Sequence, residues 1–250
     1  MSERIISDIE VTVFAKETDI DSKNQKMIEE RNQILTELGF KDYPALTGED
    51  DFWLFYERYT FPKEDHDRIK AIVDRHEDSR YKNNSVTVSM DCLYAYEEAG
   101  TISLNSRVRI SDPCYDMETW CAGSLVNVLP GTYRCFYQHT GEGRVAAIKV
   151  VHQDYDSTEP TEIIPDIDVG VDSGMCGIYD EDYFRENCQD ENWYERICEL
   201  NDAETFDDEA FVSSSGYGDG GYDCFVARNA DGYIVSIGIV YIGFGEDEES

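Results

Sequence analysis

Positive charge is scarce in this sequence. Of its 250 residues, 21 are lysine or arginine, against 54 aspartates and glutamates, which gives a formal net charge of −33. A surface of this sign repels the phosphate backbone of nucleic acids, and it attracts cations and basic protein surfaces. The composition therefore argues against direct nucleic-acid binding and favours a partner protein with a basic surface.

The sequence also lacks a signal peptide, a membrane segment and a paired cysteine motif. The N-terminus, Met1-Ser2-Glu3-Arg4-Ile5-Ile6, has no apolar signal core, and no run approaches the apolar length of a membrane span. None of the eight cysteines, at positions 92, 114, 121, 135, 176, 188, 198 and 224, forms a C-x-x-C motif. We expect a cytoplasmic protein with no membrane partner, whose cysteines are buried small hydrophobic residues; a zinc site is only weakly indicated.

The acidic excess is uneven along the chain. Residues 1–100 carry 23 acidic and 13 basic residues, whereas residues 101–250 carry 31 and 8. The segment 154–209 holds 20 acidic residues, with Arg185 and Arg196 as its basic residues. Two interpretations stay open: acidity that promotes solubility, or an acidic decoy for a nucleic-acid-binding protein. The candidate partner-binding residues are Asp180, Glu181, Asp182, Asp207, Asp208 and Glu209.

Residues 1–100 predict the order strand, helix, strand, helix, strand. The expected elements are a strand over residues 9–14, a helix with its N-cap at Ser22 and its end at Gly39, an aromatic strand over 52–56, a helix opened by Pro62, and an extended segment over 86–96. This order fits a small α/β sandwich, and a ferredoxin-like arrangement is compatible with it.

The pattern changes after Gly100, where short apolar strands alternate with turns. Pro130-Gly131, Gly141-Glu142-Gly143 and Asn229-Ala230-Asp231-Gly232 are typical of hairpin turns, and residues 180–200 look helical. We therefore predict an α+β protein: a small α/β domain (1–100) packed with a mostly antiparallel β-sandwich or barrel (101–245). The second domain contains an inserted helix near 180–200, and residues 246–250 form an acidic tail.

A glycine-rich stretch, Ser213 to Tyr222, is the most distinctive part of the sequence. It contains four glycines and Asp219, and it leads into the alternating segment from Asp223 to Ala227. Two other stretches, Ser111 to Tyr115 and Gly170 to Gly174, also place an aspartate beside proline or close to glycine in a polar turn. Glycine at such places predicts tight turns that position their neighbours.

Asp112, Asp172 and Asp219 form one hypothetical site. Carboxylates that converge from three turns could hold Mg²⁺ or Ca²⁺, with Ser173 and the backbone at Gly218 and Gly220 completing a ligand site. Such a metal could activate water for hydrolysis. The alternative is that these aspartates are turn residues that bond their own backbone. The sequence does not say whether the three turns converge.

These stretches together resemble a known family. Ser111-Asp112-Pro113-Cys114-Tyr115, Trp120-Cys121-Ala122-Gly123, Gly170-Val171-Asp172-Ser173-Gly174 and the run from Ser213 to Tyr222 follow one another as in a family of bacterial and phage proteins known as a domain of unknown function. The resemblance covers roughly residues 105–243. It implies a related fold and a phage or bacterial setting, and it transfers no catalytic residue because the family has no established activity.

The preferred hypothesis is an acidic protein-binding module, with a nucleic-acid-mimicking inhibitor of a host or defence protein as its sharper form. The alternative is a metal-dependent enzyme or small-ligand binder built on Asp112, Asp172 and Asp219. A structural phage component is a third possibility. Nothing in the sequence identifies a catalytic motif, so enzyme activity is the less favoured interpretation.

Overall fold

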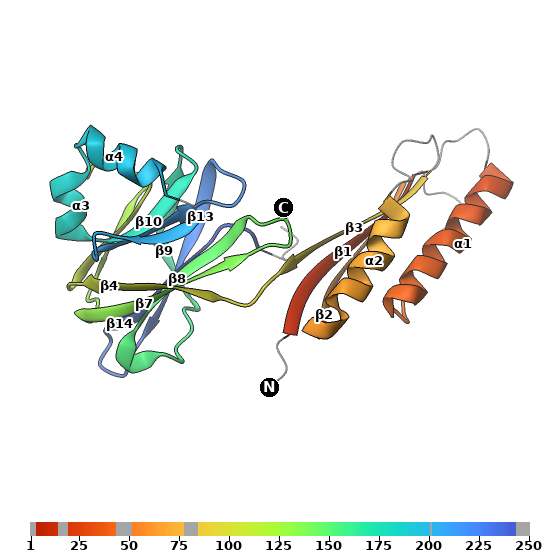
Figure 1. Cartoon of the computed structure of the whole chain (residues 1–250), viewed down its shortest axis with the longest axis horizontal. Helices are drawn as coiled ribbons and strands as arrows, with labels where there is room; N and C mark the ends of the chain where they lie inside the picture. The colour runs from red at the N-terminus through yellow and green to blue at the C-terminus, as the bar shows by residue number, and fades with distance from the viewer. Residues whose placement is uncertain (1–3, 15–19, 44–51, 78–84, 201, 244–250) are drawn as a thin grey trace. The chain divides into compact units, whose positions relative to one another are not determined.

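The chain forms an α+β protein with two compact units. The computed structural model describes residues 4–14, 20–43, 52–77, 85–200 and 202–243 (Figure 1). One unit is formed mainly by Met1–Ala95, and the other by Tyr96–Gly243. Among the described helices, none is both long enough and apolar enough to cross a membrane.

The first unit is a three-stranded antiparallel sheet with helices packed on it. Its elements are β1 (Arg4–Phe14), α1 (Ile20–Leu38), β2 (Phe52–Pro62), a short 3-10 helix (Lys63–Asp65), α2 (His66–Glu77) and β3 (Ser85–Leu93). The strand order is β2-β1-β3, and both pairs are antiparallel. The predicted order of elements is confirmed. Because β2 and β3 are both antiparallel to β1, they run parallel to each other on either side of it and are joined through α2. This split βαβ arrangement is compatible with the ferredoxin-like prediction.

The core of this unit lies between the helices and one face of the sheet. Ile9 and Val11 of β1 are buried with Val88 of β3, Ile34 of α1 and Ile69 of α2. Because successive side chains of a strand point to opposite faces, alternate positions of β1 can all face the helices. The predicted strand over residues 9–14 therefore contributes its alternate positions to this core.

Two helix starts differ from the prediction. Helix α1 begins at Ile20, so Ser22 lies inside the helix and not at its N-cap. Pro62 ends β2, where it pairs with Arg4, and a 3-10 turn follows before α2 begins at His66. The predicted end of α1 is confirmed: Gly39 has φ +97°, and the Phe40 N–H donates to the Leu35 carbonyl at 2.9 Å, as in a Schellman motif.

The second unit is a sandwich of two antiparallel sheets. The five-stranded sheet has the order β11-β12-β10-β5-β6, and the six-stranded sheet has the order β4-β7-β8-β14-β13-β9. The strands are β4 (Glu97–Leu104), β5 (Arg107–Ser111), β6 (Gly123–Val126), β7 (Gly131–His139), β8 (Val145–His152), β9 (Glu162–Val171), β10 (Met175–Asp180), β11 (Ala203–Phe206), β12 (Ala210–Ser214), β13 (Gly220–Arg228) and β14 (Ile234–Val240). A 3-10 turn, Gln153–Tyr155, follows β8. The predicted α+β class with an antiparallel sandwich is confirmed.

The two sheets meet at both of their edges. At one edge the Ser103 N–H of β4 donates to the Asp208 carbonyl in the β11–β12 turn at 2.8 Å. At the other edge the Gly170 N–H of β9 donates to the carbonyl of Cys121, shortly before β6, at 2.7 Å. The sandwich is therefore nearly closed into a barrel, which limits the unpaired strand edge it exposes.

Two short helices cover the outer face of the five-stranded sheet. They are α3 (Glu181–Asn187) and α4 (Glu191–Cys198), and Figure 1 shows both beside β10. Tyr179 of β10 and Val212 of β12 pack against Phe184, Trp193 and Ile197 of these helices. The inner face packs toward the other sheet, so both faces of these central strands are buried, which explains their nearly continuous burial.

Some predicted details of this unit are wrong. The single helix expected over 180–200 is two helices, because the Asp190 side chain caps a new start by accepting from Asn192 N–H at 3.0 Å. Strands β11 and β12 were not predicted. Pro130-Gly131 connects the two sheets, whereas the hairpins at 141–143 and 229–232 are confirmed.

The cysteine prediction holds for half of the set. Four cysteines are buried (Cys92, Cys135, Cys176 and Cys224). Cys121 and Cys188 are partly buried, while Cys114 and Cys198 are exposed, and all eight thiols are free. The exposed pair lies in the loop after β5 and at the end of α4, where packing on the sheet ends.

Candidate functional site

Asp112 joins two of the three predicted turns. It follows β5 and is completely buried. Its Oδ2 accepts hydrogen bonds from the backbone N–H groups of Asp172 and Ser173, at 2.8 and 2.7 Å. Its Oδ1 accepts from the Cys114 N–H and from the Ser173 hydroxyl, both at 2.7 Å. This carboxylate bonds the backbone of its own loop, as aspartates in turns often do, and it also bonds the β9–β10 turn. It therefore holds the two loops together.

The third turn, between β12 and β13, is closed by its own hydrogen bonds. The Ser215 hydroxyl donates to the Gly218 carbonyl at 2.9 Å, and the Tyr222 hydroxyl donates to the same carbonyl at 2.7 Å. Gly216 and Gly218 have φ of +58° and +108°, a region that glycine adopts at little cost. The carbonyl of Gly218, a candidate ligand group, is thus already used within the turn.

The β9–β13 ladder brings this turn beside the other two. Gly220 pairs with Val171, and Gly221 pairs with Gly170. Asp219 and Asp172, each next to one of these paired residues, therefore flank the same end of the ladder. The convergence that the sequence left open occurs for these two aspartates.

A pocket of about 410 Å³ lies where the three segments meet. Its lining residues are Tyr115, Thr119, Trp120, Cys121, Gly170, Val171, Asp172, Asp219, Gly220 and Gly221. Three predicted site residues, Asp172, Asp219 and Gly220, are among them, and Asp112, Ser173 and Gly218 are not. The two large aromatic residues were missed as site residues, although both belong to the segments that carried the family resemblance.

The aromatic residues of the pocket differ in exposure and in electrostatics. Trp120 is 85% exposed. Tyr115 is partly buried, and this burial, together with hydrogen bonds to Cys121 and Asp172, raises the pKa of its hydroxyl. Tyr115 therefore stays neutral at physiological pH and can hold Asp172 by a hydrogen bond.

The thiol of Cys114 beside this pocket is also held in its neutral form. Although the residue as a whole is exposed, partial desolvation of the thiol raises its pKa to about 12, and a hydrogen bond and the negative charge of Asp112 add to the effect, followed by the charge of Asp172. A nucleophilic cysteine needs a lowered pKa. The surroundings of Cys114 favour the opposite, so this loop is not arranged for thiol chemistry.

The described residues do not form a metal site of the predicted kind. Within them, no group of three or more His, Cys, Asp or Glu side chains is arranged to hold a metal ion. Asp112 is committed to four hydrogen-bond donors and does not line the pocket. Its role is to position the loops, and the Mg²⁺ or Ca²⁺ site built on all three aspartates stays a prediction without a matching arrangement.

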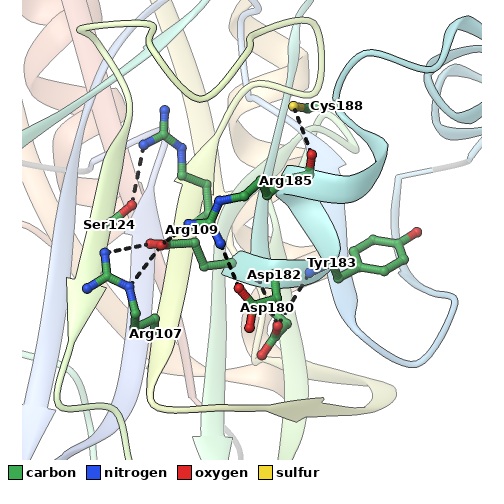
Figure 2. A network of polar contacts seen from close by, with 9 residues as sticks. Arg107, Arg109, Ser124, Asp180, Asp182, Tyr183, Arg185 and Cys188 are labelled. Atoms are coloured by element: carbon green, nitrogen blue, oxygen red, sulfur yellow. Dashed lines mark hydrogen bonds and ion pairs between the residues drawn. The ribbon is translucent and has the colours of Figure 1, made fainter.

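Two of the candidate partner-binding residues are buried. Asp180 is 2% exposed; it accepts from the Asn105 N–H at 2.8 Å and caps α3 through the Asp182 N–H at 3.1 Å. Glu181 is 1% exposed and pairs with Arg107 at 2.9 Å and with Arg185 at 2.6 Å. Figure 2 shows Arg107, Arg185 and the cap at Asp180 converging at the start of α3. The expectation that Asp180 and Glu181 contact a partner is therefore wrong, because both anchor α3 to the sheet.

The pKa of Glu181 reflects this anchoring. Burial alone would raise it, but hydrogen bonds from Arg107 and Ser124 and then the charge of Arg107 outweigh burial, so the pKa of Glu181 is lowered. Figure 2 also shows the neighbouring Arg109, which is buried and donates to the Ser124 hydroxyl at 3.4 Å. This network stabilises α3 and leaves Glu181 no free acceptor face toward solvent.

The other four candidates lie at the surface. Asp182 is exposed and pairs with Arg185, and Asp207 accepts from Arg196 at 2.8 Å and from the Tyr183 hydroxyl at 2.9 Å. Asp208 is exposed in the same turn. Burial, followed by the charges of Asp180, Glu186, Asp207 and Asp208, raises the pKa of Glu209. The raised pKa marks a dense group of carboxylates around the β11–β12 turn.

Comparisons with known proteins do not add a relative. No protein-family model, no curated protein and no solved structure matches the chain.

Proposed function

We propose that the chain is an acidic protein-binding module whose second unit binds a partner with a basic surface. The observation that carries this proposal is that most basic residues of the second unit form ion pairs with carboxylates of the same unit. Between Tyr96 and Gly243 there are 29 acidic and 8 basic residues. Six of the eight basic residues already pair with carboxylates of the same unit: Arg107, Arg134, Lys149, Arg185, Arg196 and Arg228.

The remaining carboxylates give the unit an excess of negative charge. Of the other two, Arg109 is buried within the field of Glu181, and Arg144 lies over the Tyr217 ring at 4.9 Å; neither forms an ion pair among the described residues. We define the acidic helical surface as the exposed residues Asp182, Glu186, Glu195, Glu199, Asp207 and Asp208. A field of one sign over such a surface accelerates association with an oppositely charged partner.

The same charge supports a narrower form of the proposal. Dense surface carboxylates imitate the charge of a nucleic-acid backbone, so the partner would be a nucleic-acid-binding protein, such as a host or defence protein, that the module inhibits. Direct binding of nucleic acid by the module itself is disfavoured by the like charge. Eight free cysteines, including the exposed Cys114 and Cys198, suit a reducing compartment and support a cytoplasmic location.

Affinity capture with charge-neutralised variants tests the proposal. The test variant combines Glu186→Gln, Glu195→Gln and Asp208→Asn, all at exposed positions of the acidic helical surface. The control combines Glu29→Gln, Glu30→Gln and Asp67→Asn, which removes the same charge from exposed positions of the first unit. The immobilised proteins are exposed to bacterial lysate, and bound proteins are identified and re-tested in purified form.

The expected result is a basic protein that binds the wild type and the control, and that binds the test variant at least tenfold more weakly. Its affinity should fall steeply with salt, because exposed charges more than about 8 Å apart are screened at 0.15 M ionic strength. Equal loss in both variants would mean that only the overall charge matters. If none of the captured basic proteins binds the wild type in purified form, the proposal is refuted, and the acidic residues serve only to keep the protein soluble.

A further inference from the structure

We infer that the pocket between Trp120, Asp172 and Asp219 receives an arginine side chain of the basic partner. This inference rests on the proposed function and assigns one specific contact to it. The pocket lies apart from the acidic helical surface in its residues, and it combines a cavity, an exposed aromatic ring and two carboxylates.

The charge of the pocket selects a cation. None of the described residues that line it is basic, whereas Asp172 and Asp219 both line it and are exposed. Asp112 and Asp223 add negative charge in the adjoining turn and strand. A cationic group would therefore gain favourable electrostatic interactions there, and an anion would be repelled.

Trp120 specifies the kind of cation. An 85% exposed indole beside carboxylates leaves a large apolar surface in water. The face of a tryptophan ring attracts cations through its quadrupole, at exposed sites as well as buried ones. Guanidinium is planar, so it can stack on the indole while its N–H groups donate to a carboxylate; a lysine ammonium offers only a point charge. Tryptophan and arginine are also the residues most often central to protein interfaces.

The shape and rigidity of the site fit a side chain. A volume of about 410 Å³ lies in the lower part of the range for ligand pockets, about 300–1,000 Å³. Gly170, Gly220 and Gly221 contribute no side chains to fill it. Asp112 fixes the backbone of Asp172, and the hydrogen bonds of Tyr222 close the turn before Asp219. The two carboxylates are thus held in place before any partner arrives, which reduces the entropic cost of binding.

The experiment is a titration of the full-length protein with three small probes. N-acetyl-argininamide, N-acetyl-lysinamide and N-acetyl-citrullinamide are added while the Trp120 indole N–H resonance is followed by NMR. Citrulline keeps the shape of arginine without its charge. The variants are Asp172→Asn with Asp219→Asn, and Trp120→Leu followed through backbone resonances of the pocket. Glu118→Gln, at an exposed position in the same loop that does not line the pocket, is the control.

We expect the arginine probe to shift the indole resonance with the highest affinity of the three, and the citrulline probe to bind at least fivefold more weakly. The double aspartate variant should lose about five- to tenfold in affinity for the arginine probe, because two exposed ion pairs are removed. Trp120→Leu should lose about two- to fivefold, as expected for a cation–π contact at an exposed site. Glu118→Gln should bind like the wild type. Unchanged thermal unfolding of the exposed variants verifies that the loss is local.

The outcomes separate this inference from the proposed function. If the captured basic protein binds the pocket variants as tightly as the wild type but loses affinity for the Glu186, Glu195 and Asp208 variant, the proposed function stands and the pocket inference fails. If citrulline binds as well as arginine, or lysine binds better, the assignment of an arginine is overturned. If the arginine probe binds but no basic protein needs the pocket, its occupant is a free small cation and the inference is again overturned.

Discussion

Replacing Asp112 with asparagine should destabilise the second unit far more than its small chemical change suggests. The buried carboxylate accepts four hydrogen bonds, two at each oxygen. The amide retains one accepting oxygen. In the more favourable orientation of the asparagine, its NH₂ group occupies the position of Oδ1. The Ser173 hydroxyl can rotate to accept a hydrogen bond from this NH₂, but the Cys114 N–H then faces another donor and loses its acceptor. One charge-assisted bond is lost, and the two at the other oxygen become neutral.

The magnitude follows from these losses. A hydrogen bond to a charged group contributes about 1.5–3 kcal/mol, and a buried donor without a partner costs about 1–3 kcal/mol. Together with the weakening of the two remaining bonds, we expect a loss of roughly 3–5 kcal/mol. For a unit of this size each kcal/mol corresponds to about 2–4 °C, so the midpoint should fall by roughly 10 °C.

The assay compares Asp112→Asn with Asp116→Asn in the same loop. Asp116 accepts from the Glu118 N–H at 2.9 Å and the Thr119 hydroxyl at 3.0 Å, both at one oxygen, so an asparagine can keep both bonds. Both variants change the net charge equally. Urea unfolding is followed by tryptophan fluorescence in a Trp53→Phe background, in which Trp120 and Trp193 of the second unit remain, and hydrogen exchange is measured for residues 112–122 and 171–175.

The expected pattern is a large loss and faster exchange in both segments for Asp112→Asn, with a change below about 1 kcal/mol for Asp116→Asn. An Asp112→Asn protein no less stable than Asp116→Asn would refute the assignment of Asp112 as the residue that joins the two turns. Faster exchange confined to residues 112–122 would also contradict it, because the β9–β10 turn should loosen at the same time.

Three further changes test other parts of the fold. Glu181→Gln should lower the free energy of unfolding by roughly 1–3 kcal/mol in urea, a moderate loss because Arg107 and Arg185 are half exposed. The pKa of Glu181 is lowered in the folded state, so its ionised form stabilises the fold at neutral pH, and the difference between the two proteins should shrink as pH falls through that pKa. A pH-independent difference would argue against the ion pairs. Gly177→Ala places a Cβ 2.6 Å from the Tyr179 ring and should lower the stability measured by thermal unfolding by about 1–3 kcal/mol. Gly243→Ala, whose Cβ would have no atom within 4 Å, should leave that stability unchanged. Equal stabilities of the two variants would exclude the close approach at Gly177. Burial, with a smaller effect of the Asp223 charge, raises the pKa of Cys224 to about 12 in the folded state. The protonated thiol therefore favours the folded state fully below pH 9, and this contribution is lost as pH rises toward 12. The stability of the wild type should decline more steeply above pH 9 than that of Cys224→Ala, and parallel curves would contradict the raised pKa.

The acidic residues illustrate what a count of charges leaves out. Asp180, Glu181 and Asp182 are consecutive and look equivalent in the sequence, yet the first two are buried and the third is 74% exposed. The difference arises because Asp180 ends β10 and caps α3, and because Glu181, the first residue of α3, forms an ion pair with Arg107 of β5. Contacts between residues more than 70 positions apart decided which carboxylates reach solvent.

The sequence by itself determined the class of the protein and several local features. Alternating apolar residues gave the strands, Gly39 ended its helix, the Asn229–Gly232 turn made a hairpin, and the composition set the charge. These features depend on neighbours a few residues apart, so local preferences suffice to predict them.

Only the tertiary structure decided how the three aspartate turns are used. Strand pairing placed Asp172 and Asp219 at one pocket, and it turned Asp112 inward as the acceptor that ties two loops together. It also split the sandwich into two sheets and left Trp120 exposed beside the carboxylates. Register and burial depend on pairings between distant segments, which no spacing within a single stretch can specify.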